Sequence, residues 1–402
     1  MTRKRHTLVH ERYHRPLMNE VLPFEIPPTF SNAGFFLFCS RINLKLQRDR
    51  KDFILSFQGV SLNDLLVLDF LFPCKDSKIS VTATSKKKII SQWNKKEIGF
   101  YSLKIDHKNL PINTKPLNFN ISHKGGKIRE LSIPHPRNQL DICNIYDKFH
   151  AEIIDICARS SFSIRRPYKR AKTSIFNDTI QKSNHSHAMH YREEFDKAYE
   201  NIGSYFSYYR YSNVYRFYES YTYHNAERKF NLLLRQDIQR CFDSIYTHTI
   251  AWASHTKEAI KDNLPQSYYI FTSLFDTVQR SLNYNETNGI VIGPEFSRIF
   301  SEIILQDVDV KVENILWKDY NIIRGVDYEC FRYVDDYFIF CNDIECCDKI
   351  SFVLQGVLKE KKLSLSDTKK EIIEKPLITS ITKAKDRILF TFKTMISDNY
   401  ID

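Results

Sequence analysis

Residues 329–342 read ECFRYVDDYFIFCN, with an aromatic, apolar run on each side of Asp335 and Asp336. Two such runs around a two-residue acidic turn predict a β-hairpin with both carboxylates at its tip. Adjacent carboxylates raise one another's pKa unless a cation lies between them, and Mg²⁺ with its oxygen ligands is the usual cation. An arbitrary pair of aspartates is more often a solvated surface turn, so the rest of the chain must decide.

The composition restricts the class of protein. The chain has 402 residues, 42% of them apolar, and this length predicts two or three domains. Its net charge of +11 predicts an anionic partner. No apolar run approaches the ~18 residues that span a bilayer, and the basic start MTRKRH lacks the apolar segment of a signal peptide. Nine scattered cysteines without a CxxC pair predict free thiols in a reducing cytoplasm rather than disulfides or a zinc site.

A third aspartate follows an apolar strand upstream of the hairpin. Residues 229–246, KFNLLLRQDIQRCFDSIY, change from an apolar run to a helical pattern at Asp237. If this strand neighbours the hairpin, the Asp237 carboxylate meets the hairpin tip and can share a metal ion.

Two glycine-containing segments are the next candidates. Residues 288–298, NGIVIGPEFSR, contain Gly289 and Gly293, and the proline after Gly293 suits the first turn of a helix. Residues 121–134, ISHKGGKIRELSIP, predict a hairpin with a Gly-Gly turn, on which Lys127 and Arg129 point to one face. That pair suits a triphosphate, because Arg can bind phosphate oxygens with two bonds. The alternative is an ordinary charged hairpin.

Residues 199–223 contain nine tyrosines, two phenylalanines, Arg210 and Arg216. Aromatic side chains among arginines can stack on unpaired bases. The favoured alternative is a helix pair that buries the rings and keeps the hydroxyls at the rim. Priming of synthesis by a tyrosine hydroxyl stays open.

Together these motifs resemble the reverse transcriptases over roughly residues 30–375. YVDD resembles their YxDD box, DIxxxFxSI their motif A, residues 288–298 their motif B, and KKLSLSDTKKEI their motif D. One departure is Ile292, where many members carry Gln. FSIRRP, GPEFSR and FRYVDDYFIF resemble the bacterial antiphage, abortive-infection class. The opening KRHTLVHERYHRPLMNEVLPFE resembles the second reverse transcriptase of a two-polymerase defence system that carries a non-coding RNA.

The resemblance implies an α+β right-hand polymerase with palm and fingers, whose antiparallel palm sheet is backed by helices. It implies Mg²⁺ ions held by Asp237, Asp335 and Asp336, with Ile238 as a further metal-contacting position. It also implies nucleotide contacts from Lys127, Arg129, Phe242, Gly293 and Lys369. The expected domains are a basic extension (1–30), fingers with part of the palm (31–190), a Tyr-rich helical segment (191–228), the palm (229–375) and the start of a thumb or a C-terminal extension (376–402).

The activity implied is RNA-directed DNA polymerisation in antiphage defence. The implied partners are dNTPs, a non-coding RNA, the DNA product, a second reverse transcriptase and further copies of the chain in an oligomer, in the cytoplasm and without a membrane. Three alternatives stay open: a polymerase that extends a protein or DNA primer without a template, a silent RNA-binding scaffold, and an RNA polymerase. The intact acids argue against the scaffold and Phe242 against the RNA polymerase.

We predict that Phe242 excludes ribonucleotides. In the implied arrangement its ring lies beneath the sugar, where a 2′-hydroxyl would collide with it. Relieving such a clash costs on the order of 1–3 kcal/mol, roughly ten- to a hundredfold in selectivity. Phe242→Val should therefore raise rNTP relative to dNTP incorporation in single-nucleotide assays. Equal losses with both sugars would show that Phe242 is only a core residue.

Overall fold

The computed structural model describes residues 7–9, 13–27, 29–48, 52–72, 100–106, 113–123, 126–171, 173–176, 190–193, 204–263, 270–377 and 380–398. The chain divides into two compact units. The first comprises residues 1–159, 166–212 and 242–307, and the second comprises residues 160–165, 213–241 and 308–402. Helices and small antiparallel sheets build both units, so the expected α+β class is confirmed.

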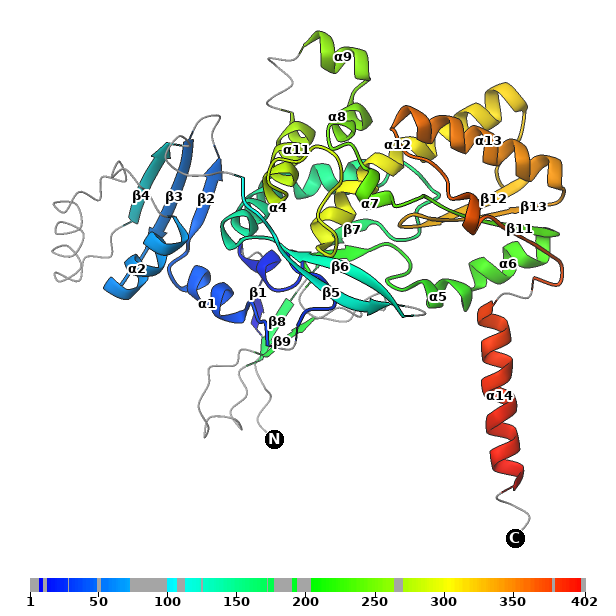
Figure 1. The fold of residues 1–402 in the computed structure, drawn as a ribbon, viewed down its shortest axis with the longest axis horizontal. Coiled ribbons are helices and arrows are strands. Elements are labelled where there is room, and N and C mark those ends of the chain that lie inside the picture. The colour runs from blue at the N-terminus through cyan, green and yellow to red at the C-terminus, as the bar shows by residue number, and fades with distance from the viewer. Residues whose placement is uncertain are drawn as a thin grey trace. The chain divides into compact units, whose positions relative to one another are not determined.

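The first unit carries most of the strands of the N-terminal half (Figure 1). Its elements are β1 (Thr7–Val9), η1 (Arg15–Leu17), α1 (Ala33–Arg41), β2 (Lys45–Arg48), β3 (Asp52–Gln58), α2 (Leu62–Leu71), β4 (Phe100–Asp106), β5 (Leu117–His123), β6 (Lys127–Ile133), α4 (Pro136–Ile156), β7 (Pro167–Arg170), β8 (Thr173–Phe176), β9 (His190–Glu193), β10 (Phe206–Tyr208), α8 (Thr249–Ser254), α9 (Lys257–Asp262) and α11 (Phe271–Leu282). Helix α7 (Cys241–Ser244) begins at the boundary of the units, and α12 (Glu295–Tyr320) runs from the first into the second.

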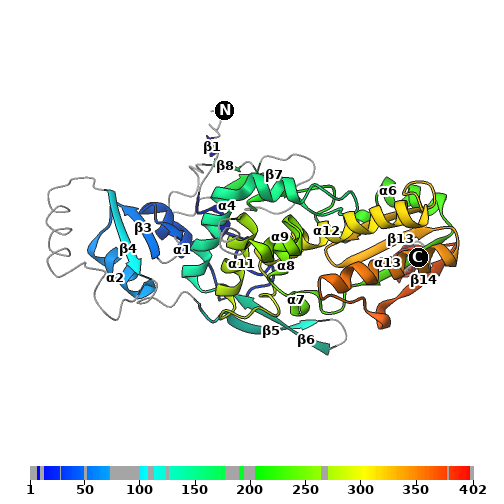
Figure 2. The same ribbon diagram turned by 90° about the horizontal axis from the view of Figure 1, so that it is seen from above.

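The second unit is built on a four-stranded antiparallel sheet with the order β12-β13-β11-β14. Its elements are α5 (Val214–Tyr218), α6 (Tyr221–Lys229), β11 (Leu232–Asp237), β12 (Tyr328–Tyr333), β13 (Asp336–Cys341), α13 (Ile344–Glu360), η3 (Asp367–Lys369), β14 (Glu371–Glu374) and α14 (Ser380–Asp398). The predicted hairpin is β12 and β13, and the strand that ends at Asp237, β11, pairs with β13 (Figure 1). Figure 2 shows the same sheet from above, with β13 and β14 labelled.

Side-chain alternation gives this sheet two different faces, because successive residues of a strand point to opposite sides. One face carries Phe331, Phe338 and Phe340, whose rings pack on Phe217, Tyr218 and Tyr223 of α5 and α6 at centroid distances of 5.1–5.7 Å. The other face carries Arg332, Tyr337 and Gln236, which bond to residues of α12 and α13. Figure 1 shows the two helix pairs on opposite sides of the sheet.

The Tyr-rich segment therefore serves mainly as core. Tyr205, Tyr208, Tyr218 and Tyr223 are buried, so the interpretation as buried rings is confirmed for these four. The segment is not helical throughout, because Phe206–Tyr208 forms strand β10, which pairs with β7. Tyr215 and Tyr221 expose 49% and 76% of their surface.

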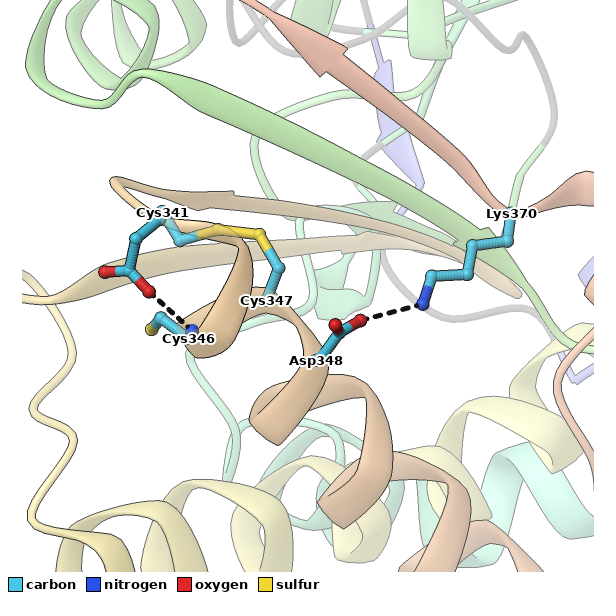
Figure 3. Close-up of a disulfide and its surroundings, with 6 residues drawn as sticks. Cys341, Cys346, Cys347, Asp348 and Lys370 are labelled. Atoms are coloured by element: carbon cyan, nitrogen blue, oxygen red, sulfur yellow. Dashed lines mark hydrogen bonds and ion pairs between the residues drawn. A yellow bond between two sulfur atoms is a disulfide. The ribbon is translucent and has the colours of Figure 1, made fainter.

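A disulfide joins β13 to α13, contrary to the expectation of free thiols. Cys341 ends the strand and Cys347 lies in the first turns of the helix, with their Cα atoms 6.3 Å apart (Figure 3). Beyond it, Lys370 pairs with Asp348 of the same helix at 3.1 Å. Among the other described cysteines, five are buried free thiols and Cys346 is half-buried. The sequence spacing held no signal for this pair, since the strand-to-helix turn creates the proximity.

The glycines of residues 288–298 occupy backbone conformations that other residues avoid. Gly289 has a φ of +84° and Gly293 a φ of +123°. A Cβ on Gly293 would lie 2.6 Å from Cγ of Pro23, and one on Gly289 would lie 3.1 Å from the carbonyl oxygen of Asp243. Both positions therefore require glycine, as the scarcity of glycine in the chain suggested. None of the described helices has the length and apolar character needed to cross a membrane.

We predict that Gly293→Ala destabilises the chain by about 1–3 kcal/mol. An alanine is strained at the φ of this position, and its methyl group collides with Pro23. Gly356→Ala is the matched control: no heavy atom lies within 4 Å of a Cβ there, and the position is inside α13. That change should stabilise by roughly 0.5–1 kcal/mol. Urea unfolding measures both, and equal stability of Gly293→Ala and wild type would contradict the argument.

Candidate active site

Two strand ends bring the predicted acids together. In the antiparallel register of β11 and β13, Asp237 lies directly opposite Asp336, and Asp336 in turn lies opposite Tyr333 of β12. The amide of Ile238 donates to the carbonyl oxygen of Asp335 at 3.3 Å. The predicted neighbourhood of the strand ending at Asp237 and the hairpin is thus confirmed.

The turn itself differs from the prediction. Its two central residues are Val334 and Asp335, and Asp336 is already the first residue of β13. Val334 has a φ of +59°, a region that β-branched residues rarely adopt. The preference of acidic residues for turns favoured Asp335 and Asp336 as the turn pair, but the strand register decides otherwise. Asp335 therefore lies at the tip, and Asp336 is held in the sheet.

Mutual repulsion is visible at Asp335. Burial raises the pKa of its carboxyl group to about 7, and the neighbouring carboxylates of Asp336 and Asp237 add to the effect. The ammonium group of Lys369 opposes it. Near neutral pH this group is therefore poised between its two charge states, and a bound cation would favour the charged one.

Backbone hydrogen bonds between the end of β11 and residues 364–366 bring Lys369 to the acids. The Ser366 amide donates to the Asp237 carbonyl oxygen at 2.8 Å, and the Gln239 amide donates to that of Ser364 at 2.9 Å. The Lys369 ammonium group forms an ion pair with the Asp237 carboxylate, which raises the pKa of the lysine. Its side chain remains 66% exposed, so it is free to move toward a ligand. The sequence predicted Lys369 as a nucleotide contact, and the structure adds its ion pair with Asp237, which was not predicted.

A cavity of about 450 Å³ adjoins these groups. Its lining comes from β11, β13 and the segment that leads into β14: Arg235, Gln236, Asp237, Asp336, Tyr337, Phe338, Thr368, Lys369, Lys370 and Glu371. Both signs of charge line it, so the cavity suits a ligand that carries phosphate groups together with cations.

The three acids offer the oxygen atoms that a divalent metal ion prefers as ligands. No group of three or more His, Cys, Asp or Glu side chains is already arranged as ligands in the described part of the chain. The donor set nevertheless fits a hard cation, because one buried Asp237 oxygen, Oδ1, has no hydrogen-bond partner among the described residues. Ile238 is buried and apolar, so only its carbonyl oxygen could serve as a ligand.

The other nucleotide-binding candidates lie in the first unit, where backbone bonds connect them. The Ile290 amide donates to the Phe242 carbonyl oxygen at 2.9 Å, and the Ser132 amide of β6 donates to that of Ile292 at 2.9 Å. Arg129 is exposed on β6, opposite Ile121, which confirms the predicted hairpin. Lys127 begins this strand, and its side chain lies outside the described residues.

One buried ion pair was not predicted. Arg332 in β12 and Asp309 in α12 are both fully buried and pair at 2.8 Å behind the hairpin. A charged residue inside an apolar strand signals a buried partner. The partner itself could not be named, because 23 residues separate the two.

Residues 168–385, more than half of the chain, match the family model described as reverse transcriptase (RNA-dependent DNA polymerase). The chain belongs to the reverse transcriptase family. The matched range contains Asp237, Asp335, Asp336 and Lys369, so the antiparallel sheet of the second unit is its palm sheet.

Solved structures of telomerase are among the similar folds. A Candida albicans telomerase in complex with a fragment of telomeric RNA is 13% identical, with 65% of this chain and 42% of that chain covered and a TM-score of 0.36. An apo telomerase from Candida tropicalis is 11% identical, with 66% and 44% covered and a TM-score of 0.39. This chain thus spans less than half the length of these two telomerase chains. No curated protein matches it.

We predict that Asp335 makes stability fall as pH rises in metal-free buffer. Its folded pKa, about 7, exceeds the ordinary 3.8, so between these values the folded state binds more protons than the unfolded state. Asp335→Asn should remove this fall in stability. The fall is about 1.4 kcal/mol for each unit by which the pKa is raised, and solvent screening reduces it. Urea unfolding of both proteins at the two ends of this window measures it.

Asp319→Asn, on an exposed position of α12, is the matched control and should leave the pH dependence of the wild type unchanged. A stability difference between wild type and Asp335→Asn that stays constant with pH would contradict the assignment of the raised pKa to Asp335.

Proposed function

We propose that this chain is an RNA-directed DNA polymerase of antiphage defence, with its active site at the adjoining ends of β11 and β13. The observation that carries the proposal is the register that sets Asp237 opposite Asp336, next to Asp335, within the region that matches the reverse transcriptase family. Asp237 and Asp336 line a cavity of mixed charge, and Asp335 lies in the adjoining turn. Such a group of carboxylates is suited to binding divalent cations that accompany a triphosphate.

The acids would hold two Mg²⁺ ions. Asp237 and Asp335 would bind both, with Asp336 and the Ile238 carbonyl oxygen as further ligands. When bound, the ions supply activation of the primer hydroxyl and stabilisation of the leaving pyrophosphate. The chain's own task is to position the reactants and neutralise charge, since phosphoryl transfer needs little acid–base chemistry. The exposed Lys369 ammonium group is available to leave Asp237 and to donate a proton to the pyrophosphate.

The first unit would bind the nucleotide. Arg129, and Lys127 beside it in sequence, would neutralise the triphosphate, and Phe242 would contact the sugar. Gly293 lets the backbone turn sharply at this segment, because its φ of +123° is closed to other residues. In this proposal residues 229–375 form the palm, and residues 31–190 form the fingers with part of the palm.

The defence role rests on sequence resemblance. FSIRRP, GPEFSR and FRYVDDYFIF resemble the antiphage class, and the opening resembles the second reverse transcriptase of a two-polymerase system. We therefore propose a non-coding RNA, a second reverse transcriptase and further copies of this chain as partners in the cytoplasm. Sequencing the nucleic acid that copurifies with the wild-type chain tests the RNA partner and the product together.

A second candidate function is synthesis without a nucleic-acid template, from a protein primer. It is supported by the exposed side chains of Tyr215 and Tyr221 and by Ile292 at a position where many family members carry Gln. Product that stays with the protein after denaturation and phenol extraction would support protein priming, and free product would reject it. Sequencing products made with and without added RNA separates templated from untemplated synthesis.

We predict that Asp335→Asn combined with Asp336→Asn abolishes dNTP incorporation. The carboxylates would hold the cations that stabilise the developing negative charge, and losing even one such stabilising group costs roughly 10²–10³-fold. The matched control is Asp262→Asn with Asp319→Asn, which removes two negative charges from exposed helix positions. A labelled-dNTP assay measures both. Undiminished incorporation by the first variant would place the active site elsewhere.

A further inference from the structure

We propose that Arg332 is a positioning residue: its guanidinium group, fixed by Asp309, holds the Val334–Asp335 turn in the conformation that lets the acids bind a cation. The inference rests on the proposed function and assigns a role to a buried pair that touches neither substrate nor metal. Four observations carry it.

The first observation is the geometry of the buried pair. Arg332 Nε donates to Asp309 Oδ2 at 2.9 Å and to Oδ1 at 3.1 Å, and the Nη2 atom lies 2.8 Å from Oδ2. The Tyr337 hydroxyl donates to Asp309 Oδ1 at 2.8 Å. Both charged side chains are 0% exposed. The guanidinium plane is therefore fixed in one orientation from the side of α12.

The second observation links this pair to the turn. The remaining guanidinium nitrogen, Nη1, donates to the carbonyl oxygen of Val334 at 2.9 Å. Val334 is the residue with a φ of +59°, at the turn position where glycine is usual in tight hairpins. A β-branched residue does not adopt that conformation unless its surroundings hold it there. The Arg332 bond is a direct contact of this kind, and the next residue is Asp335.

The third observation is that the Arg332 backbone is held as firmly as its side chain. Its amide donates to the Phe162 carbonyl oxygen at 2.7 Å, and its carbonyl oxygen accepts from the Ile164 amide at 2.9 Å. These residues belong to the FSIRRP segment and form a bridge at Ser163 beside β12. Arg332 thus fixes the turn relative to two neighbouring segments, residues 162–164 and helix α12.

The fourth observation concerns why the pair is charged. A buried ion pair contributes little net stability compared with apolar residues of the same volume, because both charges lose their hydration. Its advantage lies in geometry. Only the planar guanidinium group can bind a carboxylate with two bonds and still direct another N–H at a carbonyl oxygen. Lysine keeps the charge but cannot make this set of bonds.

The test compares Arg332→Lys with Arg324→Lys in the full chain. Arg324 flanks the other end of β12, where it pairs with Glu329 at 2.5 Å, so its replacement weakens the hairpin away from the turn. Calorimetry with Mn²⁺ alone measures cation affinity, and circular dichroism confirms folding. We expect Arg332→Lys to bind Mn²⁺ at least tenfold more weakly than wild type and Arg324→Lys to stay within twofold. Wild-type affinity in folded Arg332→Lys overturns the inference.

Two further variants keep the test decisive. If Arg332→Lys does not fold, Asp309→Asn retains the side-chain shape while removing the charge that fixes the guanidinium group, and it should weaken Mn²⁺ binding several-fold. Adding Val334→Gly to either variant should restore part of the affinity, because glycine adopts the turn conformation unaided. Folded Asp309→Asn with wild-type affinity, or no rescue by Val334→Gly, overturns the inference.

The same titrations separate this inference from the proposed function. Wild-type binding of Mn²⁺ that disappears in Asp335→Asn with Asp336→Asn supports the proposed site whatever Arg332 does. Absence of Mn²⁺ binding by the wild-type chain overturns both. Amide hydrogen exchange at Asp335 and Asp336 adds a measurement without metal: it should accelerate in Arg332→Lys and not in Arg324→Lys, and equal exchange in both variants overturns the inference.

Discussion

Repulsion among three carboxylates is the constraint on which the second unit depends. Asp237, Asp335 and Asp336 lie at adjoining strand ends, and burial together with the two neighbouring carboxylates raises the pKa of Asp335. Charges that repel separate unless the surrounding structure resists. Here the resistance comes from the sheet, which holds Asp237 and Asp336 in register, and from Lys369, which balances one of the charges. A site that gathers these three acids is therefore also strained, consistent with the left-handed backbone at Val334.

The two faces of the palm sheet are held in place by different interactions. The aromatic face packs on α5 and α6, so ring contacts such as Phe217–Phe338 give the hairpin a rigid support. The opposite face uses polar bonds to α12 and α13, including Gln236 to Ser351 at 2.7 Å. Apolar packing holds the sheet against the helices but is non-directional. Hydrogen bonds are directional, so they specify the backbone conformation at a turn. The buried Arg332–Asp309 pair lies on this second face, directly behind the acids.

In the first unit, backbone bonds rather than side chains connect the nucleotide-binding candidates. Ile292 is informative, because its carbonyl oxygen accepts from Ser132 of β6. Any residue can supply that bond, so the replacement of the usual Gln leaves the scaffold intact and affects only what the side chain can contact. The departure from the family pattern thus concerns the ligand rather than the fold.

The sequence by itself determined the elements and the identity of the acids. Two aromatic, apolar runs predicted β12 and β13, an aspartate at a strand end predicted Asp237 beside them, and scarce glycines marked the backbone at Gly289 and Gly293. These features are local, since period, propensity and allowed φ act within a few residues. Tertiary structure alone decided that the turn is Val334 and Asp335, that Lys369 reaches Asp237, that Cys341 pairs with Cys347, and that Asp309 is the partner of Arg332. Each of these depends on register or on which elements pack together, and long-range packing leaves no periodic signal in the chain.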